Sequence, residues 1–475
     1  MKALAAAVFW GLLGAAASAG QPTWILMQNP HFRVLSSAGE RDTREVLDQF
    51  ELISRFFSQI TNAGPGTGEP VPVMIFGSEK EYQPYRLNEF ATAYYFDQGD
   101  RDFIVVGKLG EQNKQTASHE YTHLELARAG FTLPPWLNEG IAELFSTLNK
   151  KGEFTLYGDV LPGRLQELQE QKWVPLQTIL EVDHSSPYYN ESGKAGIFYD
   201  ESWALVHMLA TSELYRDKFW GFVAAVSRGK DSAEALQQAY GVPLSKIEDN
   251  VRAYVHRNSF YQIKVKVALD AEEKLSSQPA DPFEVREMQA VLMMSFRDRL
   301  PEARSRLEAL TQEDPKRPGP WADLGALTWR DGNGDKAAEY FGKAYDLGDR
   351  RSKMELDYAH LVAPLSRDRS VEVLHDYLRQ KPDDAEARLF LGQMLMSLER
   401  FQEALTAVSP IAAVRTDQEI DDLLYLRAYA FLRLKYFDAA RATAEKLKSV
   451  ASSDALRSRA EDILRMVAQQ APAAH

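Results

Sequence analysis

The chain has 475 residues, of which 45% are hydrophobic and 26% are charged, as in ordinary soluble globular proteins. This length exceeds what one hydrophobic core usually organises, so we expect at least two domains. The formal net charge of -13 argues against a nucleic-acid partner, because phosphate binding needs a positive surface. The chain contains no cysteine, which excludes disulfides and thiolate ligands, so any metal ligand must be His, Asp or Glu.

The first residues have the layout of a secretory signal peptide. Lys2 gives a positive start, residues 3–13 are apolar, and residues 17–19 form a small-residue cleavage site. A membrane anchor is the alternative, but a span needs roughly 20 apolar residues, more than this stretch offers. We therefore expect residues 1–19 to be removed. The protein is then exported, periplasmic or extracellular, with no stable membrane anchor after cleavage.

Residues 20 to about 110 should mix strands with one helix. Strands are expected at residues 32–36, 71–76 and 103–107. Apolar residues between the first two strands recur at steps of four and three, as on the buried face of a helix: Val46, Phe50, Ile53, Phe57 and Ile60. The strand at 103–107 could pair with an extended peptide along its edge, although a purely structural role is the alternative.

The segment SHEYTHLELARAG contains a candidate metal motif made of His119, Glu120 and His123. Positions four apart lie on one face of a helix about 6 Å apart, so both imidazoles can reach one ion. Glu120 lies beside them, placed to take a proton from a water that the metal activates. The alternative is a helix with two surface histidines and no metal. Gly130 is the expected end of this helix.

A third ligand is expected from the segment LPPWLNEGIAELF. Glu139 and Glu143 lie one helical turn apart in it and share a face. The simplest assignment makes Glu139 the ligand, and Glu143 the acceptor that holds a ligand imidazole in its tautomer. The reverse assignment stays open. Two imidazoles and one carboxylate leave a fourth position for water, which is the ligand set of catalytic zinc, Zn²⁺.

The two motifs together resemble the gluzincin metallopeptidases. HEYTH matches their HExxH, and WLNEGIAEL matches the third-ligand helix of the aminopeptidase N and thermolysin relatives. The chain is most similar to the peptidase MA-like domains of bacterial exported proteins. This resemblance implies an α+β zincin-like catalytic domain over residues 20–265. Only 15 residues separate His123 from Glu139, fewer than in the better-known relatives, so we expect a shorter loop and a differently shaped cleft.

The resemblance also implies a hydroxyl donor to the oxyanion of the reaction. In the aminopeptidase N relatives, a tyrosine at the start of a helix after the third ligand has this role. Tyr199, in GIFYDESWALVHML, matches that place loosely, and aromatic packing at a helix start is its alternative. For His207, two turns further on, we expect packing in the core.

The last two hundred residues are repetitive. Small or apolar residues recur at spacings of 34, 34, 33 and 36, at Ala303, Ala337, Val371, Ala404 and Ala440. The second unit has Trp321, Leu324 and Gly325 on its first helix, and Ala337, Phe341 and Ala344 on its second. This period resembles that of tetratricopeptide repeats, which stack as helical hairpins. We therefore expect an all-α tetratricopeptide-like solenoid at residues 266–467 and a tail at 468–475.

These features favour an exported zinc metallopeptidase that hydrolyses peptide bonds, with Glu120 as general base. Its repeats would recruit a peptide or protein substrate, or bind a protein partner on their concave face. The alternative is a catalytically silent HExxH domain on a tetratricopeptide scaffold for protein assembly. Hydrolysis of another amide or an ester would use the same chemistry and stays open.

Overall fold

The computed structural model describes residues 23–61, 70–87, 91–96, 103–108, 110–190, 192–267, 276–411 and 416–470. The predicted signal peptide lies outside the described residues, and so does the end of the predicted tail. The chain forms two compact units that divide between Val285 and Arg286, and each unit is described by itself. None of the described helices is both long and apolar enough to span a membrane.

The first unit is an α+β region built on a mixed six-stranded sheet in the order β4-β5-β3-β2-β1-β9. Its strands are β1 (Ile25–Gln28), β2 (Phe32–Ser36), β3 (Val71–Ile75), β4 (Ala93–Phe96), β5 (Phe103–Val106) and β9 (Ser277–Pro279). The three predicted strands are β2, β3 and β5, which run parallel. β9 pairs antiparallel with β1, so the unit extends past the predicted boundary at residue 265.

The prediction that the strand at residues 103–107 offers a free edge to a peptide is wrong. β5 lies inside the sheet, because β3 pairs with one side of it and β4 with the other. The described sheet instead ends at β4, which runs antiparallel to β5. The backbone groups of β5 are used in both ladders, so an added peptide strand has no place beside it.

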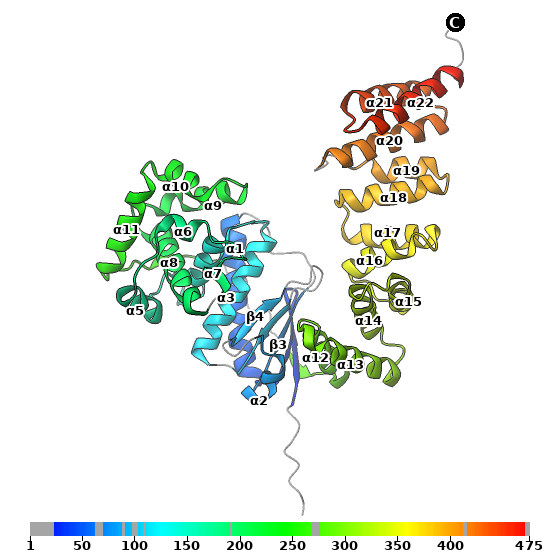
Figure 1. Ribbon diagram of the computed structural model, residues 1–475. Coiled ribbons are helices and arrows are strands. Elements are labelled where there is room, and N and C mark those ends of the chain that lie inside the picture. Colours follow the sequence, from blue (N-terminus) through cyan, green and yellow to red (C-terminus); the bar gives the residue numbers. More distant parts are fainter. Residues whose placement is uncertain are drawn as a thin grey trace, which may run out of the picture. The chain divides into compact units, whose positions relative to one another are not determined.

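Helices cover this sheet and continue away from it. They are α1 (Glu40–Thr61), α2 (Glu79–Tyr82), α3 (Glu111–Arg128), α4 (Pro135–Phe145), α5 (Pro162–Glu170), α6 (Leu176–Leu180), α7 (Pro187–Asn190), α8 (Ser192–Thr211), α9 (Phe219–Ser227), α10 (Ser232–Tyr240) and α11 (Leu244–His256), with short 3₁₀ turns at Gln83–Tyr85 and Arg216–Lys218. Figure 1 shows α1 and α3 between the sheet and the helices that follow. A small antiparallel sheet joins β6 (Asn149–Lys151), β7 (Phe154–Tyr157) and β8 (Ile263–Val265).

The core of the first unit begins between the sheet, α1 and α3 and continues through α4 and α8. The predicted apolar face of α1 is buried at Val46, Phe50, Ile53 and Phe57. Phe50 stacks on Tyr121 of α3 with ring centroids 4.6 Å apart. This packing holds α3 firmly along the sheet, and α3 is the helix that carries the HExxH motif.

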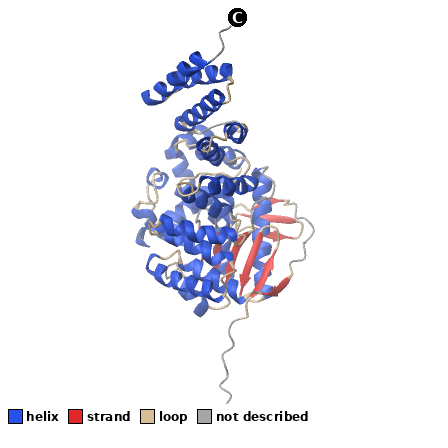
Figure 2. Cartoon of the chain, turned by 90° about the vertical axis from the view of Figure 1, so that its right-hand side faces the viewer, coloured by secondary structure: helices blue, strands red, loops and turns tan. Residues whose placement is uncertain are grey.

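The second unit is a stack of helical hairpins. Its helices are α12 (Pro282–Met293), α13 (Leu300–Glu313), α14 (Pro318–Arg330), α15 (Gly334–Asp346), α16 (Ser352–Val362), α17 (Arg367–Gln380), α18 (Ala385–Ser397), α19 (Phe401–Val408), α20 (Asp417–Arg433), α21 (Phe437–Val450) and α22 (Asp454–Gln470), with a 3₁₀ turn at Arg297–Arg299. The hairpins follow one another in chain order (Figure 1), and the described strands are confined to the first unit (Figure 2).

The predicted repeat period is confirmed by burial. All five recurring small or apolar residues lie on α13, α15, α17, α19 and α21, and each is at most 3% exposed. A Cβ on Gly325 of α14 would lie 2.6 Å from the ring of Phe341 on α15, so the glycine lets the two helices of this hairpin approach closely. The predicted tail begins inside α22, which continues to Gln470.

Candidate metal centre

The two histidines of the motif point from one face of α3. The helix starts after Gly110, and Gly130, with φ of 76°, follows its end, as predicted. His119 and His123 are one turn apart, and their ring centroids lie 4.7 Å from each other. The four-residue spacing therefore places both imidazoles close together on one face of the helix, as predicted.

Glu139 reaches the same point from α4. Prolines at 134 and 135 set the start of this helix, because a proline at the first helical position needs no N–H partner. All of α4 is buried except Asn138. A Cβ on Gly140 would lie 2.5 Å from Val206 and 2.6 Å from the carbonyl oxygen of Ser202, so only glycine lets α4 lie this close to α8.

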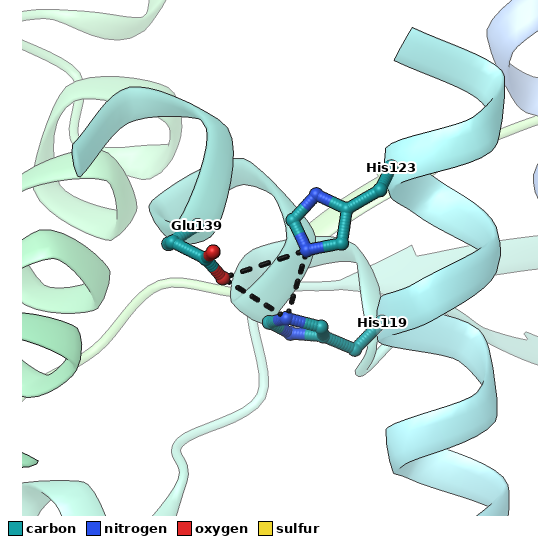
Figure 3. Close-up of side chains that lie close together, drawn as sticks. All are labelled: His119, His123 and Glu139. Atoms are coloured by element: carbon teal, nitrogen blue, oxygen red, sulfur yellow. Dashed lines mark hydrogen bonds and ion pairs between the residues drawn. The ribbon is translucent and has the colours of Figure 1, made fainter. Parts of the chain in front are cut away.

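Three candidate ligand atoms converge in Figure 3, two from α3 and one from α4. Nε2 of His119 lies 3.1 Å from Nε2 of His123, and Oε2 of Glu139 lies 3.2 Å and 3.4 Å from these two nitrogens. Bonds of about 2.0–2.1 Å to a tetrahedral zinc would separate neighbouring ligand atoms by roughly 3.3 Å. The three separations fit that geometry, and these atoms form the one such cluster among the described residues.

The pKa values of the cluster reflect its mutual attraction. Burial alone would lower the pKa of His123, but the charge and hydrogen bond of Glu139 outweigh burial and raise it to about 9. Burial opposes ionisation of Glu139 too, yet the two histidines hold the pKa of its carboxyl well below the usual range. The two imidazoles thus favour the ionised form of Glu139, which is the form that binds a cation.

The outer nitrogen of each imidazole faces an acceptor. Nδ1 of His123 lies 3.2 Å from Oδ1 of Asn138, a partner that the sequence did not predict, although it stands within WLNEG. Nδ1 of His119 lies 3.6 Å from Oε1 of Glu143, which is ion-pair range. Glu139 thus faces the centre, and Glu143 lies on the outer side of the His119 imidazole.

Glu120 lies beside the cluster and is held by the edge strand. The backbone N–H of Tyr95, on β4, donates to Oε2 of Glu120 at 3.0 Å. Burial raises the pKa of the Glu120 carboxyl, and the two neighbouring imidazoles oppose the rise. A half-buried carboxyl group with a raised pKa accepts a proton more readily than a fully solvated one, as a general base requires.

A tyrosine hydroxyl that the sequence did not single out, that of Tyr189, contacts the candidate ligand Glu139. Tyr189, on α7, donates to Oε1 of Glu139 at 3.1 Å. Tyr199 lies within α8 and not at its start, and its ring stacks on that of Tyr189 with centroids 6.4 Å apart. Tyr189 stands in no periodic pattern or motif of the sequence, so no sequence signal could have selected it. Burial raises the pKa of both phenols, so both remain neutral donors.

His207 lies in the core, as predicted. It is fully buried on α8, where Nε2 faces the carbonyl oxygen of Gly158 at 3.0 Å and Nδ1 faces the hydroxyl of Tyr254 at 2.9 Å. Burial lowers the pKa of this imidazole to about 4. A neutral imidazole with both nitrogens bonded is a structural group.

Comparisons with known proteins bear on the second unit. Residues 366–409, which contain α17, α18 and α19, match the family model of the tetratricopeptide repeat. The family match and the hairpin period together show that the second unit contains tetratricopeptide repeats. None of the curated proteins compared with the chain matches it.

The similar solved structures include two that are named as tetratricopeptide repeat proteins. YrrB, a tetratricopeptide protein with an unusual peptide-binding site, is 16% identical over 38% of this chain and 98% of its own, with a TM-score of 0.32. The pilF protein of Pseudomonas aeruginosa is 11% identical over 53% and 97%, with a TM-score of 0.27. A tetratricopeptide protein of Parabacteroides merdae is 14% identical over 54% and 100%, with a TM-score of 0.24. The comparisons give no support to the gluzincin part of the predicted resemblance.

Proposed function

We propose that the first unit is a zinc-dependent hydrolase that cleaves peptide bonds, and that the repeats recruit its peptide or protein substrate. The observation that carries this proposal is the convergence of His119, His123 and Glu139 at separations that suit one tetrahedral cation. Glu120 completes the arrangement, because a hydrolase of this type needs a base beside the metal.

The residues divide the chemistry between them. Zinc at this position would supply a Lewis acid and lower the pKa of water towards neutrality. Glu120 takes the proton of the attacking water and delivers it to the leaving amine, while the N–H of Tyr95 keeps its carboxylate oriented. Tyr189 holds the second oxygen of Glu139, so one oxygen remains directed at the centre.

The test is the variant Glu120→Gln, which keeps the shape and removes the base. We expect it to retain zinc and to lose hydrolysis of a peptide library by at least about a hundredfold, the usual scale of general base catalysis. His123→Ala should lose both zinc and activity. Cleavage by zinc-loaded Glu120→Gln at the wild-type rate would show that the assigned base is wrong.

A second function is an assembly scaffold whose HExxH unit is catalytically silent. The family match within the repeats supports this alternative better than it supports a peptidase, because such repeats commonly bind proteins or peptides. The same library separates the two functions. Zinc-loaded wild-type protein that cleaves no peptide, amide or ester substrate, yet binds a protein partner through the repeats, would favour the scaffold.

We also propose that the protein is exported to the periplasm or outside the cell, on the strength of Lys2 and the apolar residues 3–13. The N-terminus of the mature protein tests this proposal. Mass spectrometry should find it at Gly20, and a chain that still starts at Met1 in the exported fraction would contradict cleavage.

A further inference from the structure

A charged cluster lies behind the candidate metal centre and joins three helices. Arg164, on α5, forms ion pairs with Glu143 of α4 and with Asp200 of α8, whose Oδ1 lies 2.9 Å from Nη1 of the arginine. The side chains of the two acids are only 10% and 1% exposed, and that of Arg164 is 26% exposed. The guanidinium also lies over the ring of Tyr199, 5.5 Å from its centroid.

One oxygen of Glu143 connects this cluster to the candidate ligands. Oε1 accepts from Arg164 and also faces Nδ1 of His119. His119 can present a lone pair on Nε2 only in the tautomer that carries its proton on Nδ1, and an acceptor at Nδ1 favours that tautomer. Among the described residues, Glu143 is the acceptor that faces this nitrogen.

We infer that Arg164 is a positioning residue of the candidate metal centre, which acts on His119 through Glu143. The inference rests on the proposed function, since it assumes that the cluster of His119, His123 and Glu139 binds zinc. Arg164 touches none of these three in the contacts above, and its influence passes through the shared oxygen. Asp200 holds the other arm of the guanidinium and so fixes its direction.

The physical reason is the cost of an unpaired buried charge. Without Arg164, the carboxylate of Glu143 would be left nearly buried and without its cation. Its Oε1 would then no longer be held opposite Nδ1 of His119, so the imidazole loses a fixed anionic acceptor. The imidazole becomes free to adopt its other tautomer, which points an N–H at the metal position.

The experiment is a double-mutant cycle on zinc affinity, measured by competition with a chromophoric chelator. Arg164→Met and Glu143→Ala should each weaken zinc binding by roughly ten- to a hundredfold, the usual effect of losing a partner behind a metal ligand. The double variant should bind about as weakly as Glu143→Ala, because both changes remove the same interaction. Losses that multiply would overturn the inference, and so would wild-type affinity in Arg164→Met.

A matched control separates this effect from general destabilisation. Arg252, on α11, also pairs with a carboxylate, Glu248, and lies over an aromatic ring, that of Trp173. We expect Arg252→Met to keep wild-type zinc affinity, and an equal loss in it would contradict a specific role for Arg164. Arg164→Lys should recover part of the affinity, since lysine restores the positive charge but not the planar guanidinium that donates to two carboxylates at once.

The d–d absorption bands of the cobalt-substituted protein give a second readout. They should change in Arg164→Met and stay unchanged in Arg252→Met, and unchanged bands in both variants would contradict the inference. Failure of the wild-type protein to bind zinc at all would instead refute the proposed function, so the two failures are distinguishable.

Discussion

At the residue scale, the candidate metal centre depends on the hydrogen-bond partners of its ligand side chains. Each nitrogen or oxygen that faces the candidate cation belongs to a side chain whose remaining polar atoms are held by neighbours. Asn138 faces the outer nitrogen of His123, and Tyr189 holds the outer oxygen of Glu139. A buried polar group without such a partner would cost stability, so these contacts also maintain the orientation of the ligands.

Tyr189→Phe removes one of these contacts without changing the packing volume much. We expect zinc affinity to fall roughly tenfold, because the free oxygen of Glu139 loses its donor. Tyr199→Phe is the control and should bind zinc nearly as well as the wild type. Chelator competition measures both variants, and a larger loss in Tyr199→Phe would reverse the assignment of the two tyrosines.

The buried imidazole of His207 should make stability depend on pH. Its pKa of about 4 lies below the unfolded value of 6.5, so the unfolded chain binds the proton more tightly. The contribution to stability is therefore complete above pH 6.5 and is lost as the pH falls towards 4. Between pH 7 and pH 5, urea unfolding should show that the wild type loses about 2 kcal/mol more than His207→Gln. A difference between the two that stays constant with pH would contradict this.

The ligands could be predicted from sequence because their spacing is local. Four residues bring His119 and His123 onto one face of any helix. Arg164 and Tyr189 could not be predicted, because their contacts depend on where α5 and α7 pack, and no periodicity encodes that. Tyr199 was chosen by resemblance to a family, and that resemblance gave no indication of the tyrosine that donates to Glu139, Tyr189.

At the element scale, the centre depends on how closely two helices pack. α4 delivers Glu139 to the histidines of α3 while it lies against α8, and Gly140 sets the distance between α4 and α8. The sequence predicted the helix of Glu139 from its motif. It did not predict the edge strand β4, whose four residues are too few for an alternating pattern to stand out.

Gly140→Ala should separate α4 from α8. The added methyl group would overlap Val206 and a backbone oxygen, and backbone cannot yield cheaply, so we expect a loss of about 1–3 kcal/mol in the free energy of unfolding. Gly163→Ala, on α5, is the matched control, because a Cβ there meets nothing within 4 Å. Equal urea midpoints for the two variants would show that the close approach is unimportant.

At the scale of the whole molecule, the chain has two units with separate hydrophobic cores. The repeat period predicted the second unit well, because each hairpin repeats the same local contact between small and large residues. The boundary was predicted too early, since β9 returns from beyond residue 265 to pair with the first strand of the sheet. Because β1 and β9 lie far apart in the chain, no local sequence pattern indicates that they pair.

Removal of zinc should destabilise one unit and spare the other. The candidate ligands lie in the first unit, so a chelator should lower the melting temperature of that unit while the repeats unfold as before. Differential scanning calorimetry of the full chain, with and without chelator, makes this comparison. An unchanged thermogram for a preparation shown to contain zinc would contradict the linkage.

The central claim is that one zinc ion binds between His119, His123 and Glu139. Metal analysis combined with X-ray absorption at the zinc edge tests it most directly. We predict one zinc per chain, coordinated by nitrogen and oxygen atoms at about 2.0–2.2 Å, with two imidazoles in the fit. The ion should be lost in His123→Ala and in Glu139→Ala. Wild-type protein that takes up no zinc, or variants that keep it in the same coordination, would contradict the account.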